Sequence, residues 1–235
     1  MGVGPTADEF AQLIDHTNLH AAATRAEIER LCAEAREHHF RMVAINQVQT
    51  SLCRKLLEGS DVHVGAAISF PLGQTSIQSK VFDTEDAIRN GADEIDYVIN
   101  ITELKAGNLA YLRKEMDSIV QVCRDRDVLS KVIFENCYLT PDEIRTMSEI
   151  AVQVRPDFIK TSTGFGTGGA TIEDVRLMKS VVGETVKVKA AGGIRTLDQA
   201  LSFIDAGVQR IGTSSGVGLV NAYSARISED SKAPR

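Results

Sequence analysis

The chain has 235 residues, of which 43% are hydrophobic and 25% are charged, the composition of an ordinary globular protein. Its formal net charge of −6 argues against a surface built to neutralise nucleic-acid phosphates. No apolar run approaches the ~20 residues that cross a bilayer, and the first residues lack the basic and apolar regions of a secretion signal. We therefore expect one compact cytoplasmic domain with no nucleic-acid or membrane partner.

Cysteine and histidine spacing gives no support for a metal site. The four cysteines are scattered without a CxxC pair, which fits reduced core thiols better than a disulfide framework or a zinc knuckle. Of the five histidines, His16 and His20 have helical spacing, but that pair spans the end of a predicted strand. We expect no structural metal and no cofactor.

Short β-rich runs alternate along the chain with longer stretches of helical periodicity, which indicates βαβ units around a parallel sheet. Eight such strands suggest a closed barrel, so we predict an α/β fold, a single-domain (βα)8 TIM barrel over residues 1–220. The predicted strands are 13–17, 42–46, 63–69, 94–100, 131–137, 157–162, 186–191 and 210–214.

Helix-start signals fall between these strands, and the last segment lacks them. Thr24 followed by Glu27 has capping-box spacing, and Thr140 before Pro141 is a further helix opening. Residues 221–235 are rich in serine and charge and have no sustained apolar period. We predict a flexible C-terminal tail there.

Lys160 stands near the carboxyl end of the predicted sixth strand, where barrels of this kind carry their active sites. A lysine with an ordinary pKa near ~10.4 is protonated at neutral pH, so a nucleophilic lysine needs burial or a cationic neighbour. Lys189, on the next predicted strand, is such a neighbour. Either lysine alone could equally be solvated or ion-paired, but the two together favour chemistry.

Carboxylates on two other strands are candidate partners. Glu94 and Asp96 share one face of the predicted fourth strand, and an acid inside a barrel must be paired with a cation. Asp96 with Lys189 could move protons during a reaction or form a structural salt bridge. Asp15, at the end of the first strand, could bind a substrate hydroxyl, orient a water, or cap a turn with Thr17.

Glycine-rich segments follow the predicted sixth, seventh and eighth strands, at residues 163–169, 192–193 and 212–216. Barrels often bind phosphate with backbone N–H groups from their last loops, where glycine permits close approach. One such segment would be a weak signal, because tight turns also need glycine. Three at adjacent strand ends favour a phosphorylated substrate, with Ser214 and Ser215 as further hydroxyl donors.

Six motifs resemble those of the deoxyribose-phosphate aldolase family, a family of Schiff-base-forming class I aldolases, and together they cover nearly the whole predicted barrel. They are Ile14-Asp-His-Thr17, Phe70-Pro-Leu-Gly73, Gly91-Ala-Asp-Glu-Ile-Asp96, Phe158-Ile-Lys-Thr-Ser-Thr-Gly-Phe-Gly166, Lys189-Ala-Ala-Gly-Gly-Ile-Arg195 and Arg210-Ile-Gly-Thr-Ser214.

The resemblance implies reversible cleavage of 2-deoxy-D-ribose 5-phosphate to D-glyceraldehyde 3-phosphate and acetaldehyde, without a metal. Lys160 would form the Schiff base, and Lys189 and Asp96 match the family's proton-relay pair. A homodimer is an expectation from the family alone. The resemblance further implies a substrate-binding set, Asp15, Thr17 and Thr161, and a phosphate-binding set, Gly164, Gly192, Gly193, Ser214 and Ser215.

The sequence departs from the family pattern at three places. Ala44 stands on the second strand where many members carry an active-site cysteine, which leads to the hypothesis of better tolerance to aldehydes. The last tyrosine is Tyr223, so the sequence gives no support for a proton shuttle by a C-terminal tyrosine. Phe165 replaces a basic or polar residue, so phosphate binding must depend on backbone donors.

Two other interpretations remain open from the residues. One keeps the barrel and the lysine chemistry but changes the substrate, as in another phosphosugar Schiff-base aldolase. The other is a non-catalytic phosphosugar-binding barrel, in which the lysines and carboxylates are only a structural ion network. The presence of Lys160, Lys189 and Asp96 together argues against the second.

Overall fold

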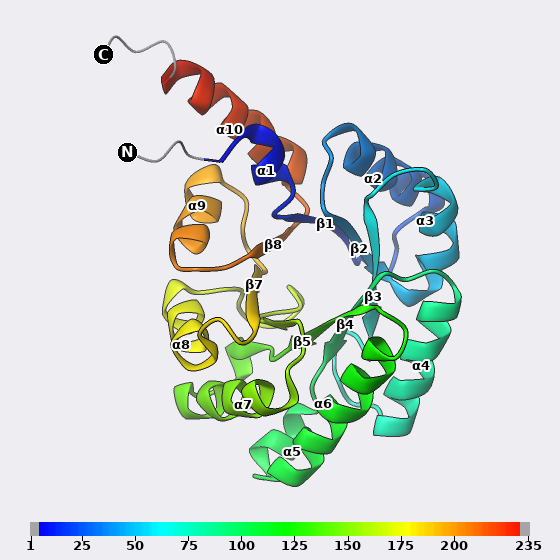
Figure 1. The fold of residues 1–235 in the computed structure, drawn as a ribbon, viewed down its shortest axis with the longest axis vertical. Helices are drawn as coiled ribbons and strands as arrows, with labels where there is room; N and C mark the ends of the chain where they lie inside the picture. The colour runs from blue at the N-terminus through cyan, green and yellow to red at the C-terminus, as the bar shows by residue number, and fades with distance from the viewer. Residues whose placement is uncertain (1–4, 231–235) are drawn as a thin grey trace.

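The computed structural model describes residues 5–230 and is a closed barrel of parallel strands (Figure 1). The strands pair in chain order, and the last pairs with the first, so the barrel has no free edge. The predicted (βα)8 barrel is therefore confirmed. The strands are β1 (Ile14–Asn18), β2 (Met42–Asn46), β3 (His63–Ile68), β4 (Glu94–Val98), β5 (Leu129–Ile133), β6 (Phe158–Lys160), β7 (Lys187–Ala191) and β8 (Arg210–Thr213).

Helices surround the barrel (Figure 1). The capping boxes predicted at Thr24 and found again at Thr140 start α2 and α7, where each threonine accepts a hydrogen bond from the backbone three residues on. The helices are α1 (Ala7–Ala11), α2 (Arg25–Glu37), α3 (Thr50–Leu56), α4 (Ile77–Arg89), α5 (Ile101–Lys105), α6 (Leu109–Arg124), α7 (Pro141–Val154), α8 (Ile172–Val182), α9 (Leu197–Asp205) and α10 (Gly216–Asp230), with short 3-10 turns η1 (Gln47–Gln49) and η2 (Asn136–Tyr138).

The main apolar core lies between the strands and the helices. Strand alternation sends residues such as Val43, Ile45 and Ile95 outward into this layer. The interior of the barrel instead receives buried charged side chains, which are Asp15, Glu94, Asp96, Lys131, Lys160, Lys189 and Arg210. No helix within residues 5–230 has the length and apolar character to cross a membrane.

The predicted fifth strand, 131–137, is shifted in the structure. Strand β5 begins at Leu129 and ends at Ile133. Glu135 has a left-handed backbone conformation, with φ 58° and ψ 61°, which a strand cannot accommodate. The chain therefore turns at Glu135 into η2, and Cys137 lies in that turn rather than in the strand.

The prediction of a flexible tail from residue 221 is wrong for residues 221–230, because α10 continues to Asp230. Tyr223 is buried, stacks on Phe10 of α1 at a centroid distance of 4.4 Å, and donates a hydrogen bond to the Pro5 carbonyl. Figure 1 shows α1 and α10 side by side. Residues 231–235 of the predicted tail lie outside the described residues.

Candidate active site

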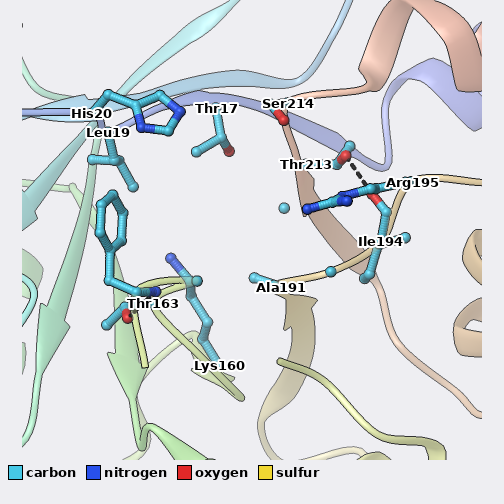
Figure 2. Close-up of a pocket in the computed structure, with 15 residues that line it drawn as sticks. Thr17, Leu19, His20, Lys160, Thr163, Ala191, Ile194, Arg195, Thr213 and Ser214 are labelled. Atoms are coloured by element: carbon cyan, nitrogen blue, oxygen red, sulfur yellow. Dashed lines mark hydrogen bonds between the residues drawn. The ribbon is translucent and has the colours of Figure 1, made fainter. Parts of the chain in front are cut away.

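Lys160 is the last residue of β6, and its side chain points into the pocket drawn in Figure 2. Its Nζ donates a hydrogen bond to Asp96 Oδ2 at 2.8 Å. Burial is the largest influence on the pKa of Lys160 and lowers it; Asp96 raises it, and the charges of Lys189 and Lys131 lower it further. The pKa falls to about 8, so the neutral, nucleophilic amine is accessible near neutral pH.

Asp96 lies at the centre of the lysines. Its Oδ2 also accepts a hydrogen bond from Lys189 Nζ at 2.9 Å, and its Oδ1 accepts one from Lys131 Nζ at 2.7 Å. Burial by itself would raise the pKa of Asp96, but Lys131, Lys160 and Lys189 together hold it well below its ordinary value. Asp96 is therefore a carboxylate, and the predicted pairing of Asp96 with Lys189 is confirmed.

A second set of charges lies against this one. Asp15 contacts Lys189 Nζ at 2.5 Å and also contacts Arg210. Glu94 contacts Arg210 at 3.1 Å and pairs with Lys131. Asp15, Glu94 and Asp96 thus each have cationic partners, which offset the cost of burying a carboxylate.

The charges in the barrel are unequal in number when every group is ionised. Three carboxylates, Asp15, Glu94 and Asp96, face four cationic groups, Lys131, Lys160, Lys189 and Arg210. The pKa of Lys131 and that of Arg210 are both raised by their carboxylates against the effect of burial, whereas that of Lys160 is lowered. Lys160 is thus better suited than those two to be the neutral amine.

A cavity of about 390 Å³ opens above Lys160. Figure 2 shows Leu19 and His20 on one side of this cavity and Ile194 and Arg195 on the opposite side. The remaining lining residues are Thr17, Thr163, Gly164, Phe165, Ala191, Gly192, Gly193, Gly212, Thr213 and Ser214. The pocket is thus formed mainly by the segments after β1, β6, β7 and β8, at the carboxyl end of the barrel.

All but one of the predicted phosphate-binding residues line this pocket. Gly164, Gly192, Gly193 and Ser214 line the pocket, but Ser215 does not. Gly192 has φ 88°, and a Cβ on Gly169 would lie only 2.1 Å from the Gly192 carbonyl oxygen. The loops after β6 and β7 therefore meet at a distance that glycine alone permits.

Of the residues predicted to contact the substrate, Thr17 lines the pocket, but Asp15 and Thr161 do not. Asp15 is fully buried against Lys189 and Arg210. Thr161 is fully buried as well, and its hydroxyl donates to the Ala191 carbonyl at 3.2 Å. Direct substrate contact by Asp15 and Thr161 is not supported by these positions.

Sequence reasoning missed several residues of the site. Lys131 and Arg210 belong to the buried charge cluster. They lie opposite Asp96 and Lys189 on the neighbouring strands, a register that alternation within one strand does not reveal. Arg195 lines the pocket, and Figure 2 shows its guanidinium extending inward. Arg195 was visible only as part of a family motif, because its position in a loop carries no periodic signal.

The fold and the site define a class of barrel enzyme, the Schiff-base aldolases, which need a buried lysine of lowered pKa in a pocket at the carboxyl ends of the strands. Comparison with known proteins agrees with this class. Residues 10–220 match the model of the DeoC/LacD family aldolases. The chain belongs to this family.

Its relatives are similar over almost their whole length. A deoxyribose-phosphate aldolase of Lactobacillus acidophilus is 60% identical over 225 residues, covering 96% of this chain and 95% of the relative. A deoxyribose-phosphate aldolase of Bacteroides thetaiotaomicron is 53% identical, over 93% of this chain and 92% of the relative. The tetrameric deoxyribose phosphate aldolase of Aeropyrum pernix superposes with a TM-score of 0.87 at 28% identity, covering 94% of this chain and 93% of that one.

Proposed function

We propose that the protein is a class I aldolase that reversibly cleaves 2-deoxy-D-ribose 5-phosphate to D-glyceraldehyde 3-phosphate and acetaldehyde. The observation that carries this proposal is Lys160, a buried amine with a pKa of about 8 in the pocket and hydrogen-bonded to Asp96. Deoxyribose-phosphate aldolase is also the name of relatives that are 45% to 60% identical.

The neutral amine of Lys160 would attack the C1 aldehyde of the open-chain sugar, and loss of water would give an iminium. Removal of the proton from the C3 hydroxyl then breaks the C2–C3 bond, and its electron pair moves to C2. This step releases D-glyceraldehyde 3-phosphate and leaves an enamine on Lys160. Protonation at C2 and hydrolysis of the iminium release acetaldehyde and restore the lysine. The iminium itself withdraws the electrons, so the proposed reaction needs no metal or cofactor.

Asp96 and Lys189 are the proposed proton relay. Because Asp96 Oδ2 accepts hydrogen bonds from both Lys160 and Lys189, one carboxylate oxygen connects the reacting nitrogen with a second ammonium group. Asp15 would act indirectly, since its ion pair with Lys189 fixes the position of that ammonium group.

The phosphate would bind at the side of the pocket formed after β6, β7 and β8, where Gly164 lies beside Gly192. Backbone N–H groups near Gly164, Gly192 and Gly193, with the hydroxyl of Ser214 and the guanidinium of Arg195, provide donors suited to an anion. Thr17, on β1, would meet the sugar hydroxyls. In this arrangement Arg195 supplies the positive charge for phosphate binding that Phe165 cannot supply.

The test is cleavage of 2-deoxy-D-ribose 5-phosphate, followed by the appearance of acetaldehyde. The wild-type protein should release acetaldehyde, and K160A should lose the activity by at least a factor of about 10³, because Lys160 is the only lysine among the residues that line this pocket. Cleavage of a different phosphosugar in preference would favour another aldolase. Phosphosugar binding without any cleavage would favour a non-catalytic phosphosugar-binding barrel.

We further propose that the protein is a cytoplasmic homodimer. Three large apolar side chains are strongly exposed, Val48 at 83%, Leu72 at 70% and Phe82 at 62%. Gln47 donates a hydrogen bond to the Asp83 carbonyl at 3.1 Å, so the neighbours of Val48 and Phe82 are in contact. Sedimentation equilibrium would measure the mass of the protein in solution. The mass of a monomer would contradict this part of the proposal.

A further inference from the structure

Glu135 is a buried carboxylate beside the pocket that the proposed mechanism does not use. Its side chain is only 2% exposed, and it does not line the pocket. Its carboxylate accepts two hydrogen bonds from a single residue that does: the backbone N–H of Thr163 donates to Oε1 at 3.1 Å, and the hydroxyl of Thr163 donates to Oε2. Glu135 is thus attached to the pocket wall from behind.

The backbone around Glu135 is arranged to make these contacts. The N–H groups of Phe134 and Asn136 donate to the carbonyls of Lys160 and Thr161, at 3.0 and 2.9 Å. Between these two hydrogen bonds Glu135 adopts its left-handed conformation. A non-glycine residue in this region carries a conformational cost, which the interactions of its side chain offset.

The hydrogen bonds of Glu135 continue into the loop after β6. The hydroxyl of Thr163 accepts a hydrogen bond from the N–H of Phe165 at 3.0 Å. Gly166 then packs on Glu135, since a Cβ on Gly166 would lie 3.2 Å from the Glu135 carboxyl carbon. One carboxylate therefore organises residues 163–166, which include the pocket residues Gly164 and Phe165.

We propose that Glu135 is a positioning residue that sets the affinity for the phosphorylated substrate by fixing the loop of residues 163–166. This inference rests on the proposed aldolase function, because the loop holds Gly164, one of the proposed phosphate donors. Lys160 precedes the loop and is hydrogen-bonded to Asp96 rather than to Glu135, so we expect formation of the Schiff base to depend little on Glu135.

The experiment compares E135Q with wild type on two substrates, 2-deoxy-D-ribose 5-phosphate and unphosphorylated 2-deoxy-D-ribose. Glutamine keeps the size of the side chain but cannot accept both hydrogen bonds through two carboxylate oxygens. We expect KM for the phosphorylated sugar to rise about tenfold, the effect of one lost hydrogen bond to a charged group, with kcat changed less than about threefold. The value of kcat/KM for the unphosphorylated sugar should also change less than about threefold.

Two further variants keep the result interpretable. E149Q, at an exposed glutamate of α7, is the matched control and should match wild type. T163V removes the hydroxyl that donates to Glu135 and should reproduce the rise in KM, and combining it with E135Q should add little, because both variants break the same contact. If E135Q does not fold, T163V alone tests the inference.

An unchanged KM for the phosphorylated sugar in both E135Q and T163V would overturn the inference, as would an equal loss of kcat/KM on both sugars, which indicates a general weakening of the site. Failure of the wild-type protein to cleave 2-deoxy-D-ribose 5-phosphate would instead remove the proposed function itself. The two failures are therefore distinguishable.

Discussion

Asp96 and Lys160 share a hydrogen bond of 2.8 Å inside the barrel, and the same carboxylate oxygen accepts a second hydrogen bond from Lys189 at 2.9 Å. This arrangement has opposing effects on the nucleophile. Asp96 raises the pKa of Lys160, whereas burial and Lys189 lower it. Asp96 therefore reduces the fraction of Lys160 that is neutral, while it also compensates the charges of Lys131 and Lys189. The proposed relay gives Asp96 a further role in a later proton transfer.

The D96N variant separates these two effects. Loss of the negative charge should lower the pKa of Lys160 further, so imine formation with acetaldehyde at pH 7 should persist. Turnover should fall by a factor of about 10² to 10⁴, the usual contribution of general acid–base catalysis. Adduct formation and steady-state cleavage would be measured on the same preparation, and turnover within tenfold of wild type would contradict a proton-transfer role for Asp96.

The rate of imine formation should depend on pH through Lys160. With a pKa of about 8, roughly a tenth of Lys160 is neutral at pH 7, against roughly one part in 2,500 for an ordinary lysine. Because the neutral amine is the nucleophile, the initial rate of adduct formation should rise as pH increases through about 8 and then level off. The amount of adduct formed before the reaction is stopped, measured at a series of pH values, would give this curve.

A matched pair of variants tests the origin of the low pKa. K189M removes a cationic neighbour that lowers the pKa of Lys160, so the curve should move toward alkaline pH. K187M removes an exposed lysine at the start of the same strand, and its curve should coincide with that of wild type. A shift of the K189M curve toward acid pH would contradict the electrostatic argument.

Ala44 should make the protein tolerant of aldehydes. It lies opposite Thr17 in the register of β1 and β2, and Thr17 lines the pocket, so a thiol at this position would stand next to bound aldehyde. Residual activity after incubation in concentrated acetaldehyde should decay several-fold faster for A44C than for wild type, because thiolates react readily with such electrophiles. Equal decay of the two proteins would refute this hypothesis.

Removal of one partner from the buried pair of Lys80 and Glu115 should destabilise the protein strongly. Both side chains are fully buried, and Lys80 Nζ lies 2.6 Å from Glu115 Oε1 and 2.6 Å from the Val98 carbonyl oxygen, just beyond Asp96 on β4. K80M would leave a buried carboxylate without its cation, and we expect the free energy of unfolding to fall by about 3 to 5 kcal/mol. Urea denaturation would measure the change.

The control for K80M is an ion pair on the surface. Arg25 and Glu29 lie 2.8 Å apart on α2, but their side chains are 75% and 44% exposed. R25A should cost less than about 1 kcal/mol, since exposed pairs gain little in water. A loss below about 1 kcal/mol for K80M as well would contradict the expected cost of leaving Glu115 buried without its cation.

The barrel could be predicted from the sequence because its eight strands are short, buried on both faces and separated by capped helices. The end of β5 could not, because the left-handed turn at Glu135 is stabilised by Thr163, 28 residues further along the chain. The last helix was missed for a similar reason. Tyr223 is buried by Phe10, from the opposite end of the chain, and no local pattern reveals that contact.

The candidate site was predicted in part. The sequence predicted that Lys160, Lys189 and Asp96 lie close together, because parallel strands of a barrel align their carboxyl ends. The position of Asp15 was not foreseen, since its choice between substrate and ion pair depends on Arg210, which lies 195 residues away in the sequence. Long-range charge pairing of this kind leaves no periodic trace.

The central claim is that Lys160 is the nucleophile, and covalent trapping tests it most directly. The protein would be incubated with acetaldehyde, reduced with borohydride and analysed by intact mass and peptide mapping, beside K160A and the control K55A, which removes an exposed lysine of α3. Wild type and K55A should each gain one reduced adduct, mapped to Lys160, and K160A should gain none. An adduct of equal yield in K160A, or none in wild type, would contradict the account.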